Sequence, residues 1–353
     1  MQESKLKTFI QVLVFTIIGS AILYFMWQSQ GVAYADQCAL EGVPSDDCSL
    51  FDKLVSDYAN ANIYWLIIIS ICFTISQLFR SIRWKLMLKP MGYEISHFNS
   101  FATLMVGYFA NLGVPRIGEF VRAGMISKYE NVPVEKAFAT IVVERIVDVI
   151  MLLIAIVLGL VFHYEKLWGY ISEHLSLSTN SLLIGIAILI GAGLVGLFLL
   201  KRILSLDNDK LHPIAKKIKG LIEGFVDGLL SIKDIPQVGM FIFYSIGIWV
   251  MYYLMHYLAF FSFEPTSHLG PLDGLLVFDF GSLGVVFPSP GGMGSYHFMI
   301  KEALLLFDVN TVDGFSFAMI SFFTLTIFCT ILIGLASLIL LPIINQKKTI
   351  NGQ

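Results

Sequence analysis

The chain has 353 residues, of which 56% are apolar and only 14% are charged, and its mean hydropathy is +0.77. A composition this apolar excludes a water-soluble globular domain and indicates an integral membrane protein. The net charge of -3 and the four cysteines exclude a nucleic-acid-binding protein, a disordered chain and a small disulfide-rich scaffold.

Six long apolar runs predict transmembrane helices, because a helix needs about 20 apolar residues to cross a hydrocarbon core about 30 Å thick. In chain order these runs are residues 8–27, 61–79, 137–162, 181–200, 238–263 and 315–344. Two further apolar stretches, 98–125 and 272–307, are interrupted by Gly-Val-Pro at 113–115 and by Pro-Ser-Pro-Gly-Gly at 288–292. Such interruptions predict helical hairpins rather than complete crossings.

Lysine and arginine predict the orientation of these elements, because cytoplasmic loops are enriched in both residues. Three lysines, Lys53, Lys166 and Lys301, fall in the segments expected outside, and Arg145 falls inside a span. The remaining lysines and arginines fall in the segments expected on the cytoplasmic side, together with both termini. This distribution places both ends of 98–125 in the cytoplasm and both ends of 272–307 outside.

The predicted fold is therefore an all-α polytopic membrane protein with six transmembrane helices and two oppositely oriented re-entrant helical hairpins. The chain is expected to form one membrane domain, an inverted repeat with halves at about 8–162 and 181–344. Inverted repeats of this kind are typical of transporters. A plain bundle of eight spans remains open, because hydropathy alone separates hairpins from spans poorly.

Two features are expected outside the spans. Cys38 and Cys48 lie in the outer loop and could form a disulfide in an oxidising compartment. In residues 211–233, apolar side chains recur at helical spacing opposite a set of lysines, which predicts an amphipathic helix at the cytoplasmic surface. That helix could bind anionic lipid or could simply cover the bundle.

The first interruption carries the first candidate binding site. If Pro115 begins a helix, as proline can, then Arg116, Glu119 and Arg122 share one face of it. Glu119 would then hold both guanidinium groups in position for a phosphate, and the intervening Gly118 and the preceding break favour a binding site here. A simple cytoplasmic salt-bridge cluster is the alternative.

The predicted span 137–162 carries three charged residues, Glu144, Arg145 and Asp148. Each isolated charge in a membrane helix costs at least about 2.5 kcal/mol on insertion scales, so these residues must face partners or water. Arg145 could neutralise Asp148 at a spacing of three residues. The sequence therefore predicts either a second part of the binding site or a structural pairing between the two halves.

The second interruption predicts an anion-binding turn. Glycines allow close approach to the backbone, and a helix beginning near Ser295 would add its positive dipole end. His297 could titrate, but the histidines show no metal-ligand spacing, and neither a metal nor a cofactor is predicted. The residues of this candidate site are Gly291, Gly292, Gly294, Ser295, Tyr296 and His297, with Asp279, Lys301 and Glu302 possible neighbours in the same cavity.

Together these motifs resemble the transmembrane region of lysylphosphatidylglycerol synthases and the related stand-alone flippase-like proteins. The resemblance rests on Arg116 to Arg122, on Glu144 to Asp148 and on the glycine turn with its Tyr296, and it covers nearly the whole chain. It implies a lipid translocase. In the family's pattern an acidic residue often follows the glycine turn where His297 stands, which argues against a borrowed proton-coupled role. No aminoacyl-transferase or glycosyltransferase segment is present, so synthase activity is not expected.

The leading hypothesis is a bacterial plasma-membrane lipid translocase that moves a phosphate-bearing headgroup between leaflets. Its expected partners are anionic or phosphate-bearing membrane lipids and not nucleic acid, and a homo-oligomer remains open. Two alternatives are a membrane-embedded transferase with Glu119 or Asp148 as general base, and a secondary transporter of a small soluble anion.

Overall fold

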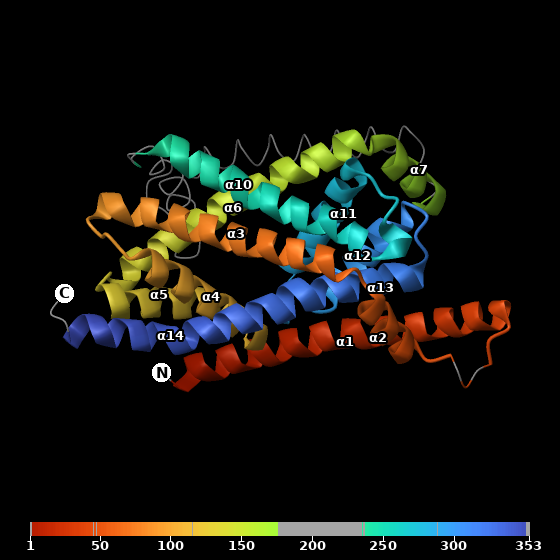
Figure 1. Ribbon diagram of the computed structural model, residues 1–353, viewed down its shortest axis with the longest axis horizontal. Helices are drawn as coiled ribbons and strands as arrows, with labels where there is room; N and C mark the ends of the chain where they lie inside the picture. Colours follow the sequence, from red (N-terminus) through yellow and green to blue (C-terminus); the bar gives the residue numbers. More distant parts are fainter. Residues whose placement is uncertain are drawn as a thin grey trace, which may run out of the picture.

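The computed structural model describes residues 2–44, 46, 48–114, 116–175, 235, 237–287 and 289–350 (Figure 1). These residues form helices joined by short turns, and no strand occurs among them, which confirms the predicted all-α class. The predicted span at 181–200 and the predicted amphipathic helix at 211–233 lie outside the described residues.

The helices follow one another in two groups. The first group is α1 (Gln2–Glu41), α2 (Leu50–Asn60), α3 (Ile63–Leu88), α4 (His97–Gly113), α5 (Gly118–Glu130), α6 (Val134–Phe162) and α7 (Tyr164–Leu175). The second group is α10 (Val238–Ala259), α11 (Pro271–Val286), α12 (Ser295–Leu305), α13 (Thr311–Phe322) and α14 (Thr330–Ile350). Short 3₁₀ turns follow α3, α10 and α11, and a π-helical segment, η8 (Phe323–Cys329), joins α13 to α14.

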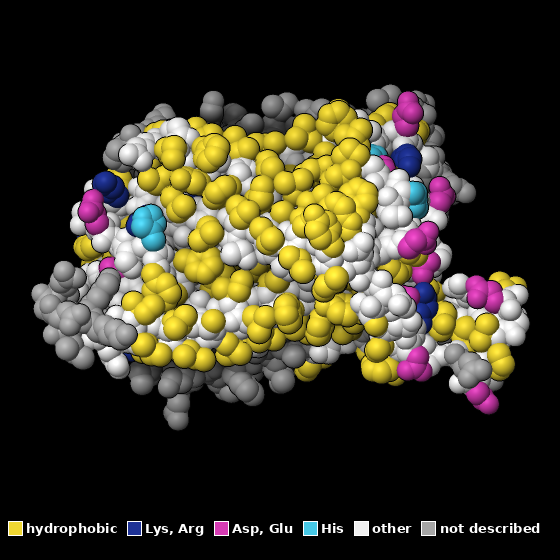
Figure 2. Space-filling view, in the orientation of Figure 1, with side chains coloured by type: hydrophobic (Ala, Val, Ile, Leu, Met, Phe, Trp, Pro, Cys, Tyr) yellow, Lys and Arg dark blue, Asp and Glu magenta, His cyan; other side chains and the backbone are white. Residues whose placement is uncertain are grey.

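Four helical stretches among the described residues are long and apolar enough to cross a membrane: Ile63–Met91, Val134–Phe162, Val238–Ser262 and Thr311–Gln346. They correspond to four of the six predicted spans, with ends shifted by a few residues or more. The predicted span at 8–27 lies within α1, which is 40 residues long and extends past the rest of the bundle (Figure 1). On the face that Figure 2 shows, apolar side chains cover the middle of the molecule, and charged side chains gather toward its two ends.

Helices α4 and α5 pack against each other as a hairpin, and a close contact between two glycines sets their distance. A Cβ atom added to Gly118 would lie only 2.0 Å from the carbonyl oxygen of Gly107. The side chain of Asn111 also accepts a hydrogen bond of 2.7 Å from the Gly118 amide. Small residues at such positions let two helix backbones approach closely.

The start of α5 differs from the prediction. The helix begins at Gly118, not at Pro115, and Arg116 stands in the preceding turn with a φ of 64°. This left-handed backbone conformation cannot belong to a right-handed helix, so Arg116 does not share a helical face with Glu119 and Arg122.

Helices α11 and α12 form the second hairpin, and α12 begins at Ser295 as predicted. Pro271 occupies the first turn of α11, where its missing amide proton costs nothing, and the Asp273 carboxylate accepts from the Gly270 amide at 2.8 Å. Gly291, Gly292 and Gly294 all have positive φ angles, which a glycine adopts without strain.

The tips of the two hairpins meet. A Cβ atom added to Gly291 would lie 3.2 Å from Leu112 near the end of α4 and 3.4 Å from Thr326 in η8. Figure 1 shows α4 and α5 at the end where both chain termini lie, and α11 and α12 toward the opposite end. The two hairpins therefore approach each other from opposite ends of the bundle.

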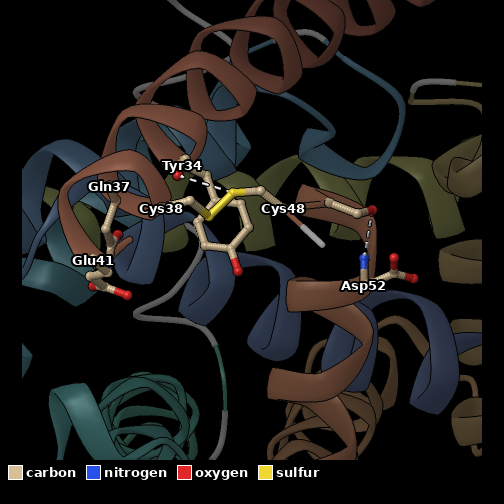
Figure 3. The surroundings of a disulfide bond; sticks show 7 residues. Tyr34, Gln37, Cys38, Glu41, Cys48 and Asp52 are labelled. Atoms are coloured by element: carbon tan, nitrogen blue, oxygen red, sulfur yellow. Dashed lines mark hydrogen bonds between the residues drawn. A yellow bond between two sulfur atoms is a disulfide. The ribbon is translucent and has the colours of Figure 1, made fainter. Parts of the chain in front are cut away.

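The long helix α1 is tied to the segment that leads into α2. Cys38 and Cys48 form a disulfide with their Cα atoms 6.3 Å apart (Figure 3), as the sequence allowed. Lys53 of α2 then bridges Asp57 and Asp313 at 3.0 Å each. Partial burial lowers the pKa of Lys53, but hydrogen bonds to these two carboxylates outweigh it and raise the pKa above its ordinary value.

The contact between Gly107 and Gly118 predicts that an added methyl group at Gly118 destabilises the first hairpin. We expect Gly118→Ala to destabilise the protein by about 1–3 kcal/mol, because the added methyl overlaps the Gly107 carbonyl. Gly124→Ala on the same helix is the matched control, since a Cβ there meets nothing within 4 Å. Thermal unfolding of the two purified variants in detergent measures the difference in their stability. Equal unfolding temperatures for the two variants would contradict the close contact at Gly118.

Candidate functional site

A cluster of charged side chains lies where α3, α5, α6 and α10 meet. We call this set the ionic cluster. Its members are Arg80 and Arg83 of α3, Glu119 and Arg122 of α5, and Glu144, Arg145 and Asp148 of α6. It brings together five of the residues that the sequence singled out and adds two that it did not.

The innermost pair joins the first hairpin to α6. Arg122 donates to Glu144 at 2.5 Å, and the two side chains are only 3% and 0% exposed. The Arg122 guanidinium also stacks on the Trp84 ring at 3.6 Å from its centroid, and Trp84 donates to Thr140 at 2.8 Å. Burial and a flat aromatic partner suit arginine, whose guanidinium is planar and weakly hydrated.

A second centre forms around Asp148, which accepts hydrogen bonds from two arginines one turn apart on α3. Arg80 donates at 2.7 Å and Arg83 at 2.9 Å. Arg80 also donates to the Tyr252 hydroxyl at 3.0 Å, and Arg83 to the Ser245 hydroxyl at 3.3 Å. Asp148 therefore holds α3, α6 and, through the arginines, α10 in one arrangement.

The rim of the cluster is the pair between Glu119 and Arg145. The Arg145 guanidinium lies 3.2 Å from Glu119 and 3.7 Å from Asp148, and its side chain is 43% exposed. Val142 and Val149, about one turn away on either side of Arg145, are exposed apolar residues. The cluster is thus open sideways onto an apolar surface of α6.

The cluster carries a surplus of positive charge. Its four guanidinium groups face three carboxylates, which leaves one positive charge among the described members. The Nε–H groups of Arg80, Arg83 and Arg122 are buried, and none has a hydrogen-bond acceptor among the described residues. Buried donors without partners are costly, and a surplus cation in such a setting favours an oxyanion ligand.

The structure corrects the predicted arrangement of the first hairpin. Glu119 pairs with Arg145 instead of holding Arg116 and Arg122, because the late start of α5 removes Arg116 from the helix. Arg116 is exposed in the turn and forms no ion pair with a described residue. Gly118 has a packing role against Gly107, which explains this glycine without a ligand.

Arg80 and Arg83 were missed because the apolar run that predicts this span ends at residue 79, which places both arginines in a cytoplasmic loop. The helix instead continues to Leu88, and both side chains are buried. A signal was present in the sequence. Apolar residues continue through Ile82, Trp84 and residues 86–88 at helical spacing, on either side of arginines three residues apart.

The second hairpin is packed more tightly than the predicted anion-binding turn required. Gly294 faces α1, where an added Cβ would lie 2.6 Å from the Gly19 carbonyl oxygen, and Gly292 faces Val285 at 3.3 Å. The Ser295 hydroxyl donates to the Gly284 carbonyl at 2.7 Å. Contacts within the protein therefore explain these residues, and whether the turn also binds an anion stays a prediction.

Tyr296 and His297 point into the bundle, away from the hairpin tip. The Tyr296 hydroxyl hydrogen-bonds Ser321 at 3.2 Å, and the His297 ring packs 4.6 Å from Phe322, with neither nitrogen bonded to a described residue.

Asp279, Lys301 and Glu302, which were expected as possible neighbours in one cavity, contact different helices. Asp279 faces α6, whereas Lys301 lies against α13 and pairs with Glu302 at 2.7 Å. Asp279 belongs to α11, whereas Lys301 and Glu302 belong to α12, and the two helices present these side chains to different neighbours.

A line of polar contacts connects the ionic cluster to the second hairpin. Tyr252, the partner of Arg80, offers its carbonyl oxygen to His256 Nδ1 at 2.9 Å. The other nitrogen of His256 lies 3.5 Å from the Tyr296 hydroxyl of α12. The described residues contain no group of three His, Cys, Asp or Glu side chains that could hold a metal ion.

The helices and the buried ionic cluster define a multi-pass integral membrane protein. The chain belongs to the family described as the lysylphosphatidylglycerol synthase transmembrane region, whose model matches residues 50–333. This confirms the resemblance noted in the sequence.

Two archaeal proteins are similar to the chain, and both are named UPF0104 membrane proteins. The relative from Methanocaldococcus jannaschii is 35% identical over 100 residues, which is 28% of this chain and 30% of the relative. The relative from Methanothermobacter thermautotrophicus is 26% identical over 249 residues, or 66% of this chain and 72% of the relative. No solved structure matches the chain.

Because Glu144 is buried against Arg122, we expect neutralising Glu144 to cost far more stability than neutralising Glu119. Glu144→Gln leaves a buried guanidinium without its countercharge and should cost about 3–5 kcal/mol of stability. Glu119→Gln should cost about 1 kcal/mol or less, because its pair with Arg145 is partly exposed.

Chemical or thermal unfolding of the purified variants measures this difference. Replacing Arg122 and Glu144 together by leucine removes both charges and should recover most of the loss. A double variant no more stable than Glu144→Gln would show that the lost stability does not come from an unpaired charge.

Proposed function

We propose that this protein is a lipid translocase that moves a phosphate-bearing headgroup from one leaflet to the other through the ionic cluster. The observation that carries the proposal is the lateral exposure of Arg145. A cationic group that opens onto an apolar helix surface can receive a headgroup whose acyl tails stay in the hydrocarbon. A site for a soluble anion would need an opening to water instead.

The proposed topology is an inverted repeat in which α4–α5 and α11–α12 are re-entrant hairpins that enter from opposite faces. Support comes from the positions of the two hairpins at opposite ends and from the contact between Leu112 and Gly291 at their tips. Irregular backbone at membrane depth is tolerated where it packs against protein, and the second turn packs against α4 and η8 at Gly291 and against α1 at Gly294.

We further propose that both termini face the cytoplasm. Lys85, Lys89 and Lys128 lie at the ends of α3 and α5 near the termini, as the positive-inside rule requires. Acidic side chains are prominent at the opposite end of the molecule (Figure 2).

Arg145 would make the first contact with the headgroup, because it is the accessible guanidinium of the cluster. A phosphate could replace Glu119 on Arg145 and then share the surplus positive charge supplied by Arg80, Arg83 and Arg122. Such replacement lowers the cost of bringing a phosphate into a medium of low dielectric constant, where an unpaired charge is very unfavourable. Arg116, exposed in the hairpin turn, would guide the headgroup toward the second hairpin.

The proposed function is tested by measuring translocation of fluorescent phosphatidylglycerol in vesicles that contain the purified protein. The vesicles consist of phosphatidylethanolamine and phosphatidylglycerol. Arg145→Gln should lower the initial rate about tenfold or more, because one charged hydrogen bond is worth about 1.5–3 kcal/mol. Arg116→Lys should lower it less, since a point charge remains but the two-pronged geometry is lost. Lys89→Gln, at an exposed ion pair with Glu94, is the control and should keep the normal rate.

Normal rates in Arg145→Gln would refute the proposed entry site. Mass spectrometry of the same vesicles separates a translocase, which leaves every lipid unchanged, from a transferase, which makes a new lipid. Uptake of radioactive phosphate into the vesicle lumen would instead identify a transporter of a soluble anion.

The proposed orientation can be tested with cysteine labelling in intact cells. After Cys38→Ala, the unpaired Cys48 should react with a membrane-impermeant maleimide added outside. A cysteine introduced by Lys89→Cys should react only after the membrane is opened. Cys72 and Cys329 are buried and should stay unlabelled in both cases. The opposite pattern would invert the topology and place the disulfide in the cytoplasm.

A further inference from the structure

The second hairpin contains a buried carboxyl group that has no partner among the residues the structure describes. Asp279 stands in the middle of α11 with only 3% exposure. Neither of its carboxyl oxygens has a hydrogen-bond partner among the described residues. The buried acids of the ionic cluster differ in this respect, because Glu144 and Asp148 are both paired with arginines.

The carboxyl group of Asp279 sits directly against α6. A Cβ atom added to Gly159 would lie 2.0 Å from Asp279 Oδ2, so only a glycine leaves room for the carboxyl at this contact. Leu276, one turn earlier on α11, lies 3.7 Å from the same point and makes the neighbouring surface apolar. The close packing of α11 on α6 therefore takes place across an acid that no described residue neutralises.

The titratable groups on the elements around Asp279 have other partners. On α6, Asp148 is bound by Arg80 and Arg83, and just beyond its end His163 pairs with Asp273 of α11 itself at 3.3 Å. On α10, His256 faces Tyr252 and Tyr296, and Tyr253 donates to the Pro271 carbonyl. On α12, Lys301 pairs with Glu302, Tyr296 bonds Ser321, and His297 packs against aromatic rings. None of these groups hydrogen-bonds or ion-pairs with Asp279.

An ionised carboxylate in this buried position would be desolvated and would have no countercharge among the described residues, which costs far more than taking up a proton. We propose that Asp279 is a proton-binding site that is loaded when α11 packs on Gly159. Loss of the proton would place a negative charge at the contact between α6 and α11 and separate the two helices. The proton would thus control whether the second hairpin is closed against α6.

A short route leads from this site to the end of the molecule opposite the termini. Gly159 lies three residues before the end of α6, or about 5 Å along the helix, and Asp273 lies six residues before Asp279, or about 9 Å. The pair of Asp273 and His163 lies where α6 ends and α11 begins, and the Asp273 side chain is 26% exposed there.

This inference rests on the proposed translocase function, because coupling requires that the second hairpin moves while a headgroup crosses. Proton exchange at Asp279 would then give headgroup movement a direction. The protonation of Asp279 itself can be measured without any transport, so the two claims can fail separately.

Difference infrared spectroscopy of the full-length protein in bilayers tests the proton-binding site. Wild type should show the carbonyl band of a protonated, buried carboxylic acid at neutral pH, and Asp279→Asn should lack it. Asp273→Asn is the matched control on the same helix and should retain the band. Asp279→Ala serves as a second variant if the asparagine variant does not fold. A band that survives both Asp279 substitutions, or that is absent from wild type, would overturn the proposal.

The coupling is tested with the fluorescent phosphatidylglycerol assay under an imposed pH gradient. With one proton per headgroup, a gradient of about one pH unit should change the wild-type rate by up to about tenfold. The rate of Asp279→Asn should not respond to the gradient. Equal responses of the two proteins would overturn the coupling. If wild type moves no lipid at all, the proposed function fails, while the infrared result still decides whether Asp279 binds a proton.

Discussion

Neutralisation of charge in a medium that cannot solvate it is the constraint on which the rest of this structure depends. Arg122 and Glu144 are almost completely buried, and Asp148 accepts from two arginines of another helix. An ion removed from water is tolerated only with a close, well-oriented partner. These pairs therefore fix which helices are neighbours: α3, α5 and α6 must meet where the charges meet.

The same constraint explains why a binding site can exist at this point. A fully balanced cluster would be a structural element and nothing more. Here the guanidinium groups outnumber the carboxylates, and Arg145 lies at the rim beside exposed apolar residues. The surplus charge and the lateral opening are separate properties, and the lipid phosphate proposed as the ligand would meet both. The family assignment is consistent with this view, since the chain belongs to the transmembrane region of lysylphosphatidylglycerol synthases.

Glycine contacts supply the second organising feature, because they let the hairpins pack at backbone distance. Gly118 rests on Gly107 within the first hairpin, and Gly159 receives the Asp279 carboxyl from the second. In the first contact the glycine serves packing alone. In the second it admits an acid whose charge state decides whether the packing is stable. At such a contact, the gain or loss of a proton changes how closely two helices pack. Acids that are paired with arginines stay charged and cannot act in this way.

Hydropathy and composition were sufficient to predict an all-α membrane protein, four of its spans and the positions of both helical hairpins. These features depend on local sequence, because an apolar run must be a helix in lipid and a Gly-Pro interruption must break it. The spacing of Glu144, Arg145 and Asp148 likewise identified a charged face on one helix. The pairing of Cys38 with Cys48 was foreseen as possible from their place in one outer loop.

Only the tertiary structure decided which charges become partners. Arg80 and Arg83 stand 68 and 65 residues before Asp148, and no local pattern connects them to it. The late start of α5 separated Arg116 from Glu119, because a left-handed turn replaced the expected helical one. The sequence by itself located the charges of α6, at Glu144, Arg145 and Asp148. Their pairing, and the isolation of Asp279, depend on how distant helices pack, since an ion pair forms between whatever groups the fold brings within about 4 Å.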